Sequence, residues 1–194
     1  MVKKVCVNLG CGTHINKSTK TEKWINIDNF ELSKKDEPDF LQADIRKIPL
    51  ESDSVDYMIC DQVLEHIPMA DVYGVLCEIR RVLKKDAKLI IMVPDFEGAV
   101  KQFLESNPNA FFDPAKYKWF AEVIYGNQET EGEYHRTPMC AGYLHFMLNL
   151  VGLHKHEISF WPEFGVIPQF EGMRKQLPTA TLRNAQLVCE VTKV

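Results

Sequence analysis

The stretch VCVNLGCG at residues 5–12 decides the fold. It begins with an apolar run, Val5–Leu9, that is typical of a buried strand, and it ends in a turn that contains Gly10 and Gly12. Because glycine has no side chain, such a turn lets a ligand approach the backbone N–H groups closely. A strand that ends in this way indicates the first strand of a parallel sheet, with a ligand bound beyond the strand ends.

Outside this stretch, short apolar runs alternate with amphipathic segments along the chain. This alternation predicts an α/β protein, in which a parallel sheet is covered by helices. The further strands are expected at Trp24–Asp28, Asp39–Gln42, Val55–Cys60, Leu89–Val93, His156–Phe160 and Gln186–Val191.

The helices are predicted from apolar side chains at helical spacing and from residues that favour helix ends. One helix is expected between the fourth and fifth strands, with Lys84–Lys85 at its C-terminal end, and its apolar face consists of Val72, Leu76, Ile79, Val82 and Leu83. The others are expected to follow Asp95, to run from Asp113-Pro114 to Gly126, and to run from Tyr143 to Gly152.

The composition indicates one domain over residues 1–194. Of its 194 residues, 45% are hydrophobic and 26% are charged, which suits a single core of ordinary size. Long irregular stretches in a compact domain are usually functional. We therefore expect the segments around 107–153 and 161–183 to be insertions on the substrate side of the domain.

Charge and segment lengths exclude several classes of function. A net charge of -4 argues against a nucleic-acid-binding protein, and no apolar stretch is long enough to span a membrane. Val5, the first residue of the expected core strand, directly follows Met1-Val2-Lys3-Lys4, so no signal peptide is expected. The six cysteines form no CxxC pair, so we expect reduced thiols, no zinc site and a cytoplasmic location.

Acidic side chains follow three further strands and indicate what the sheet edge binds. Asp28, Asp44 and Asp61 are expected to meet the glycine turn at the carboxyl ends of the strands. Such an edge suits a nucleoside, but a dinucleotide would need a third glycine where Ile15 stands. An acidic pocket also suits a cation better than a phosphate, and S-adenosylmethionine carries sulfonium and ammonium groups.

Taken together, these motifs resemble the class I S-adenosylmethionine-dependent methyltransferases. The resemblance covers residues 5 to about 95, and its motifs are Asn8-Leu9-Gly10-Cys11-Gly12, Trp24-Ile25-Asn26-Ile27-Asp28, Ala43-Asp44-Ile45, Ser54-Val55-Asp56-Tyr57, Val63-Leu64-Glu65-His66-Ile67 and Val93-Pro94-Asp95. A weaker resemblance to the family continues to Gly152-Leu153. The whole pattern resembles a group of small methyltransferases linked to surface-polysaccharide and glycan chemistry. The resemblance implies a Rossmann-like, seven-stranded, mostly parallel sheet with an antiparallel last strand and helices on both faces.

The resemblance also implies a set of cofactor-binding residues, which are Asn8, Gly10, Cys11, Gly12, Asp28, Asp44, Ile45 and Asp61. The glycine turn would approach the methionine part of S-adenosylmethionine, and Asp28 would bind the ribose hydroxyls. Asp44 and the backbone of Ile45 would contact adenine. The segment between Gly12 and Asp28 is short, so the first helix of the family is expected to be shortened or missing.

Two histidines are candidates for a catalytic base. His135 lies in a polar loop late in the chain, where this fold places substrate-binding insertions. A hydroxyl acceptor must lose a proton, and histidine is the usual base near neutral pH. His66, which follows Glu65 after the fourth strand, is the second candidate.

No metal ion is expected at the strand ends. Asp61 and Asp95 follow the fourth and fifth strands and could hold Mg²⁺ in a metal-dependent enzyme. However, Phe96 supplies no further ligand, and Asp95 is better placed to cap a helix.

The acceptor is narrowed by motifs that the sequence lacks. Asp61-Gln62-Val63-Leu64 is neither the tetrad of DNA amino-methyltransferases nor the Pro-Cys pair of carbon-5 methyltransferases. We therefore expect a small-molecule or glycan acceptor, methylated on a hydroxyl group. The alternative is a non-catalytic S-adenosylmethionine-binding module that regulates or scaffolds a partner.

Overall fold

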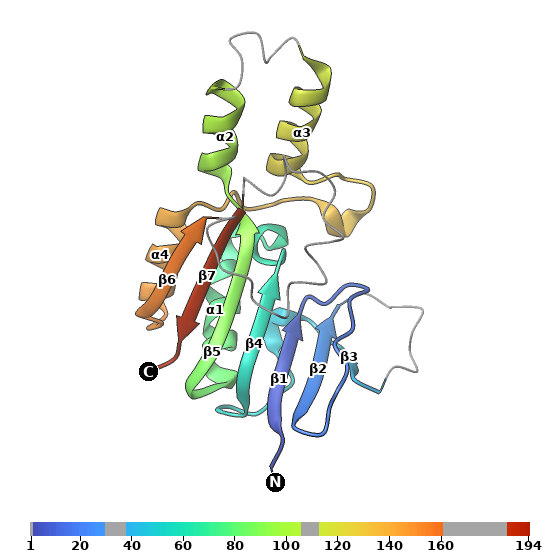
Figure 1. Ribbon diagram of the computed structural model, residues 1–194, viewed down its shortest axis with the longest axis vertical. Helices are drawn as coiled ribbons and strands as arrows, with labels where there is room; N and C mark the ends of the chain where they lie inside the picture. The colour runs from blue at the N-terminus through green and yellow to red at the C-terminus, as the bar shows by residue number, and fades with distance from the viewer. Residues whose placement is uncertain (1, 30–37, 106–112, 161–185) are drawn as a thin grey trace.

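The computed structural model describes residues 2–29, 38–105, 113–160 and 186–194, and these form a seven-stranded sheet. The strand order is β3-β2-β1-β4-β5-β7-β6 (Figure 1). The strands are β1 (Lys4–Leu9), β2 (Glu22–Asp28), β3 (Phe40–Gln42), β4 (Val55–Asp61), β5 (Leu83–Pro94), β6 (Lys155–Phe160) and β7 (Gln186–Thr192). Strand β7 is antiparallel to both of its neighbours, β5 and β6, and the other described pairs are parallel, which confirms the predicted mostly parallel sheet with an antiparallel last strand.

The helices lie on one face of this sheet and beyond the carboxyl ends of its strands. They are α1 (Met69–Val82), α2 (Phe96–Glu105), α3 (Pro114–Tyr125) and α4 (Ala141–Leu150), with short 3-10 turns η1 (Ile45–Lys47), η2 (Leu64–His66) and η4 (Glu131–Glu133). In Figure 1, α1 and α4 lie behind the sheet, whereas α2 and α3 stand side by side beyond the carboxyl ends of the strands. None of the helices in the described residues is long and apolar enough to cross a membrane.

Alternate strand residues supply two separate parts of the core. On β5, Leu89 and Ile91 face the large cluster that includes the apolar sides of α1 and α4. Ile90 and Met92 face the opposite side of the sheet, where they pack in a smaller cluster with Trp24 and Tyr57. This alternation follows from the two-residue period of a strand.

The junction between α1 and β5 differs from the prediction. Lys84 and Lys85 were expected at the end of the helix, but α1 ends at Val82 and β5 begins at the next residue. Leu83 pairs with Val55 of β4, and the Lys84 ammonium donates to the Asp56 carboxylate at 2.8 Å. Strand pairing and this ion pair therefore outweigh the favourable position of lysines at a helix C-terminus.

No helix forms between β1 and β2, as the short segment predicts. Side-chain amides hold this connection instead. Asn26 on β2 accepts from the backbone N–H of Asn16 at 2.8 Å and donates to the Asn16 carbonyl at 2.9 Å. The Asn8 amide of β1 donates to the His14 carbonyl at 2.8 Å. The backbone groups that a helix would have paired are thus paired by buried side chains.

We expect Asn26→Ala to lower the free energy of unfolding by at least about 2 kcal/mol, because it leaves both Asn16 backbone groups without their partner. Urea denaturation measures the change. Gln42→Ala serves as the control, since its exposed side chain makes one bond to the Asn29 carbonyl, and it should cost less than about 0.5 kcal/mol. Equal stability of the two variants would contradict the assigned role of Asn26.

Candidate active site

The glycine turn and Asp28 meet at the carboxyl edge of the sheet, as predicted. The Gly10 N–H donates to the Ile27 carbonyl at 2.8 Å, and the Gly12 N–H donates to the buried Asp28 carboxylate at 2.8 Å. Gly10 has a φ of +67°, and a Cβ atom there would collide with the side chain of Val63. Apart from Gly12 and its two chain neighbours, no atom of the described residues lies within 4 Å of the position that a Cβ of Gly12 would take, so the turn is open at that point.

Asn8 lies on β1 just before this turn and Cys11 lies within it. The Asn8 side chain is buried and donates to the loop that follows the turn. Cys11 is also buried, and burial raises the pKa of its thiol to about 12, with a smaller contribution from Asp28. Cys11 is therefore a neutral thiol near pH 7. The side-chain NH₂ group of Asn8 donates to the His14 carbonyl and to the Asn26 side chain.

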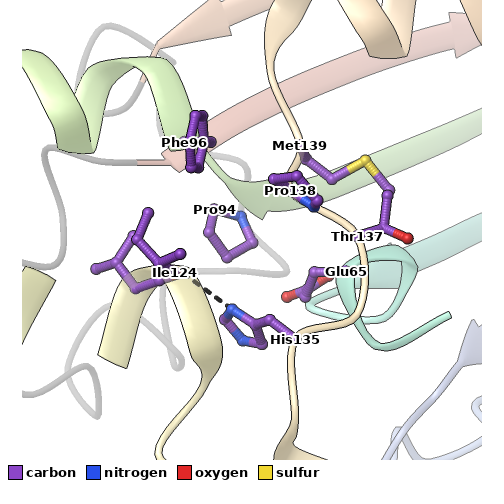
Figure 2. Close-up of a pocket in the computed structure, with 9 residues that line it drawn as sticks. Glu65, Pro94, Phe96, Ile124, His135, Thr137, Pro138 and Met139 are labelled. Carbon is purple, nitrogen blue, oxygen red and sulfur yellow. Dashed lines mark hydrogen bonds between the residues drawn. The ribbon is translucent and has the colours of Figure 1, made fainter. Parts of the chain in front are cut away.

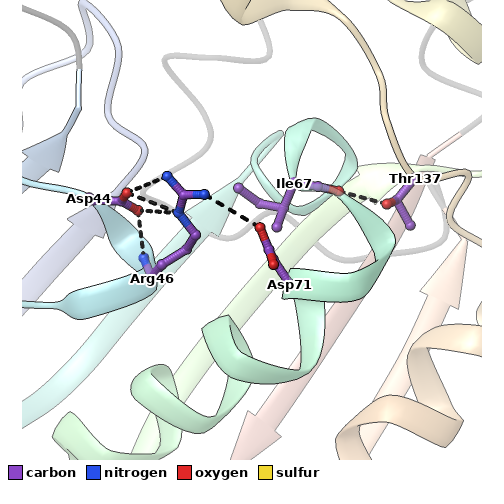
Figure 3. A network of polar contacts seen from close by, with 5 residues as sticks. All are labelled: Asp44, Arg46, Ile67, Asp71 and Thr137. Carbon is purple, nitrogen blue, oxygen red and sulfur yellow. Dashed lines mark hydrogen bonds and ion pairs between the residues drawn. The ribbon is translucent and has the colours of Figure 1, made fainter.

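Asp44 lies at the same edge but is engaged by a neighbour (Figure 3). Its carboxylate caps η1 by accepting from the Arg46 N–H at 2.8 Å, and it binds the Arg46 guanidinium, with a shortest contact of 2.6 Å. Arg46 also reaches Asp71 of α1 at 3.4 Å. The hydrogen bonds from Arg46 lower the pKa of Asp44, so this acid is charged and paired, while Ile45 beside it is buried.

Asp61 ends β4 with a carboxylate of which one oxygen lacks a protein donor. Its Oδ1 atom is buried and has no hydrogen-bond partner in the described structure. Burial raises the pKa of Asp61 to about 7, and His14 and Gln62 oppose this rise. A buried acceptor of this kind is suited to a cationic donor from a ligand.

Glu65 on η2 is a second buried acid at this edge, and its role was not evident from the sequence. The residue is 1% exposed, and both carboxylate oxygens lack a hydrogen-bond partner among the described residues. Burial raises its pKa well above the ordinary value. The only sequence signal was its position beside His66, directly after a strand end.

The two histidine candidates lie next to each other. The imidazole rings of His66 and His135 are 4.9 Å apart between centroids, in an edge-to-face arrangement. Their Nδ1 atoms lie 3.2 Å from the Tyr134 carbonyl and 2.9 Å from the Val123 carbonyl, respectively. Because a carbonyl can only accept, each Nδ1 carries a proton, and in the neutral ring each Nε2 keeps a lone pair. Burial lowers the pKa of both histidines, which favours that neutral form.

His135 is positioned from two sides. Its N–H donates to the Tyr125 carbonyl at the end of α3, where Gly126 has a φ of +77° and a Cβ would collide with the Glu133 carbonyl. The following two residues, Arg136 and Thr137, donate their N–H groups to the Glu65 carbonyl at 2.7 and 3.0 Å. The segment that carries His135 is therefore fixed to both α3 and η2.

A pocket opens beside this cluster (Figure 2). Glu65 and His135 are its acid and its histidine, and its remaining lining residues are Pro94, Phe96, Val123, Ile124, Thr137, Pro138 and Met139. The walls are mostly apolar, and none of the described residues that line them is a lysine or an arginine.

Asp95 precedes α2 and accepts from the N–H groups of Glu97 and Gly98. It therefore caps the helix, as predicted.

Two segments were expected to be insertions on the substrate side of the domain. Within the first, 107–153, α3 lies beyond the sheet edge and α4 packs on the sheet. The second, 161–183, lies outside the described residues.

All six cysteines are unpaired, as expected.

The burial of Asp61 leads to a pH prediction. Its pKa rises from an ordinary value of 3.8 to about 7, so the folded protein keeps a proton that the unfolded chain releases between these pH values. Stability that depends on this proton is complete below about pH 4 and is lost as the pH rises through 7. We expect Asp61→Asn to lose less unfolding free energy than the wild type between pH 5 and pH 8, as measured with urea.

The exposed Glu51→Gln is the control, and its pH dependence should match that of the wild type. If Asp61→Asn also loses as much stability as the wild type over this range, Asp61 is not the group responsible.

Comparisons with known proteins agree with this architecture. Residues 7–91 match the family model described as "Methyltransferase domain". An uncharacterized protein of Methanocaldococcus jannaschii is 30% identical over 89 residues, which are 44% of this chain and 38% of that relative. The matched region thus spans well under half of the relative's length.

Two solved structures share the fold over nearly the whole chain. A SAM-dependent methyltransferase from Archaeoglobus fulgidus superposes with a TM-score of 0.62 at 14% identity, over 98% of this chain and 86% of that one. The 1,6-didemethyltoxoflavin-N1-methyltransferase of Burkholderia thailandensis, solved with S-adenosylhomocysteine bound, gives 0.59 at 10% identity, over 99% and 72%. The chain therefore has the fold of the class I S-adenosylmethionine-dependent methyltransferases, and its residues 7–91 match the methyltransferase domain family.

Proposed function

We propose that this protein transfers a methyl group from S-adenosylmethionine to a hydroxyl group of a small-molecule or glycan acceptor. The observation that carries the proposal is the position of the His66–His135 pair. The pair adjoins the turn that follows β4, at the same sheet edge as the glycine turn and Asp28. A methyl donor and a hydroxyl acceptor would thus be bound on adjacent parts of one edge, which is the positioning that a displacement reaction needs.

The residues at this edge fit the cofactor. The turn is open above Gly12, and the unpartnered Oδ1 of Asp61 suits a cationic group such as the methionine ammonium. Asp28 would hold the ribose hydroxyls, and the adenine would lie near Ile45 and Asp44. When bound, S-adenosylmethionine supplies an electrophilic methyl group, whose bond to sulfur breaks as the sulfonium becomes a neutral thioether.

His135 would act as the base, through the Nε2 lone pair that its tautomer leaves available. Its Nδ1–H is held by the Val123 carbonyl, which fixes the orientation of the ring. The acceptor proton would move to Nε2 while the acceptor oxygen bonds to the methyl carbon. His66 has the same tautomer beside it and is the second candidate for the same role.

The lining of the pocket supports an uncharged acceptor. Its walls are apolar side chains such as Phe96 and Ile124, and Thr137 is the other polar residue beside Glu65 and His135. The described part of this lining includes no lysine or arginine that would pair with a phosphate or a carboxylate. A compound with an apolar body and a hydroxyl group fits it best.

We expect Asp28→Ala to weaken S-adenosylhomocysteine binding at least about tenfold, because hydrogen bonds to a charged group contribute about 1.5–3 kcal/mol each. Asp44→Ala should weaken it less, since Arg46 already engages that carboxylate. Isothermal titration calorimetry measures both. Tighter binding of NAD than of S-adenosylhomocysteine by the wild type would overturn the choice of cofactor.

Activity can be searched for with methyl-labelled S-adenosylmethionine and pools of hydroxyl compounds and glycans. Once an acceptor is found, we expect His135→Gln to lower kcat by roughly 10²–10⁴, because a base has been lost, and to leave S-adenosylhomocysteine affinity unchanged. If His135→Gln keeps most of the rate, the residue only orients the acceptor. Cofactor binding with no label transferred to any pool would favour the non-catalytic module instead.

A further inference from the structure

We propose that Glu65, His66 and His135 form a binding site for a divalent transition-metal ion such as Zn²⁺. One ligand atom from each of the three side chains lies within 4.8 Å of the other two. The residues come from η2 and from the segment that follows η4, which the Glu65 carbonyl holds together. This ligand set is distinct from Asp61 and Asp95, the acids considered for Mg²⁺ from the sequence alone.

Both histidines are oriented as metal ligands are. Each donates Nδ1–H to a backbone carbonyl, and this second interaction fixes the ring and leaves Nε2 as the nitrogen that can bind. The Nε2 atom of His66 lies 4.0 Å from the Oε1 atom of Glu65. Ligands of a tetrahedral ion with bonds of about 2.0–2.1 Å lie roughly 3.4 Å apart, so the three side chains need only a small inward movement.

Glu65 is the independent observation that points to a cation. It is 1% exposed, and neither of its carboxylate oxygens has a hydrogen-bond partner in the described residues. A buried carboxylate is stable only if it is neutral, hydrogen-bonded or bound to a cation. An ion bound by Glu65 and two imidazoles would satisfy it.

The chemistry of the ligands selects the kind of ion. Two imidazole nitrogens and one carboxylate suit Zn²⁺ and similar transition metals, whereas Mg²⁺ and Ca²⁺ prefer oxygen ligands. Three protein ligands would leave a further position for water or another molecule. Glu65 and His135 also line the pocket of Figure 2, so that position would be close to it.

The site also has a consequence for catalysis, which rests on the proposed function. The Nε2 lone pair of His135 cannot bind a metal ion and accept a proton at the same time. Occupation by Zn²⁺ would therefore inhibit methyl transfer, and chelation would leave the activity intact or raise it.

The test is metal binding by the full chain after chelator treatment, with neither cofactor nor acceptor present. Calorimetry with Zn²⁺ should show one ion per chain, and Co²⁺ should give the visible absorption of a four-coordinate site. We expect His66→Gln, His135→Gln and Glu65→Gln each to weaken Zn²⁺ binding at least about a hundredfold, since loss of even an outer partner costs about 10–100-fold.

His145→Gln is the matched control, because His145 and His156 form a separate histidine pair at 2.8 Å. It should bind Zn²⁺ as the wild type does. Wild-type binding that survives both His66→Gln and His135→Gln, binding that is lost in His145→Gln, or no binding by the wild type would each overturn the proposal.

Two further measurements separate the possible failures. Urea unfolding of each variant identifies any that does not fold, and the remaining ligand variants then decide the outcome. S-adenosylhomocysteine binding is measured on the same metal-free samples. If it fails while Zn²⁺ binds, the proposed function is wrong and the metal site stands.

Discussion

The Glu65 carbonyl accepts two backbone hydrogen bonds, from Arg136 and Thr137, and the candidate active site depends on this interaction. It fixes a late loop of the chain to the turn after β4. His135 is thereby held beside His66, and the pocket gains one wall from Pro138 and Met139. Backbone groups make the connection, so it does not depend on which side chains the loop carries, and the Glu65 carboxylate remains available for chemistry.

The strand ends could be predicted because their signals are local. An apolar run of five or six residues followed by glycine or aspartate identifies both a strand and the edge at which it ends. Gly12 and Asp28 therefore met as expected, and the short connection between them correctly indicated that no helix forms there. The end of α1 could not be predicted in this way. Lys84 suits the C-terminal end of a helix and an ion pair between neighbouring strands equally well, and only its contact with Asp56 of β4 decides between them.

The acceptor side of the site required the tertiary structure. His66 and His135 were each identifiable as titratable residues near strand ends or in a polar loop, but their contact depends on backbone bonds between segments far apart in the chain. Glu65 was missed because an acid next to a histidine is common, and only burial without a partner makes it unusual. The ion pair of Asp44 was not predicted either, although its partner Arg46 is only two residues away, because nothing in the sequence fixes the side-chain rotamers that bring the two groups together.

The way in which α1 leads into β5 has a mechanical consequence. The helix brings the chain back along the sheet, and the chain then reverses at the start of β5, where the pairing with β4 passes from Leu83–Val55 directly to Lys88–Tyr57 and Asp86 has a φ of +63°. This irregular stretch can take up an inserted residue, whereas an insertion directly after Lys88 meets regular pairing. It would turn the rest of β5 over, so that Ile90 and Met92 faced α1 in place of Leu89 and Ile91. Because Pro94 at the end of β5 is a wall of the pocket, the regular part of this strand sets the shape of the pocket.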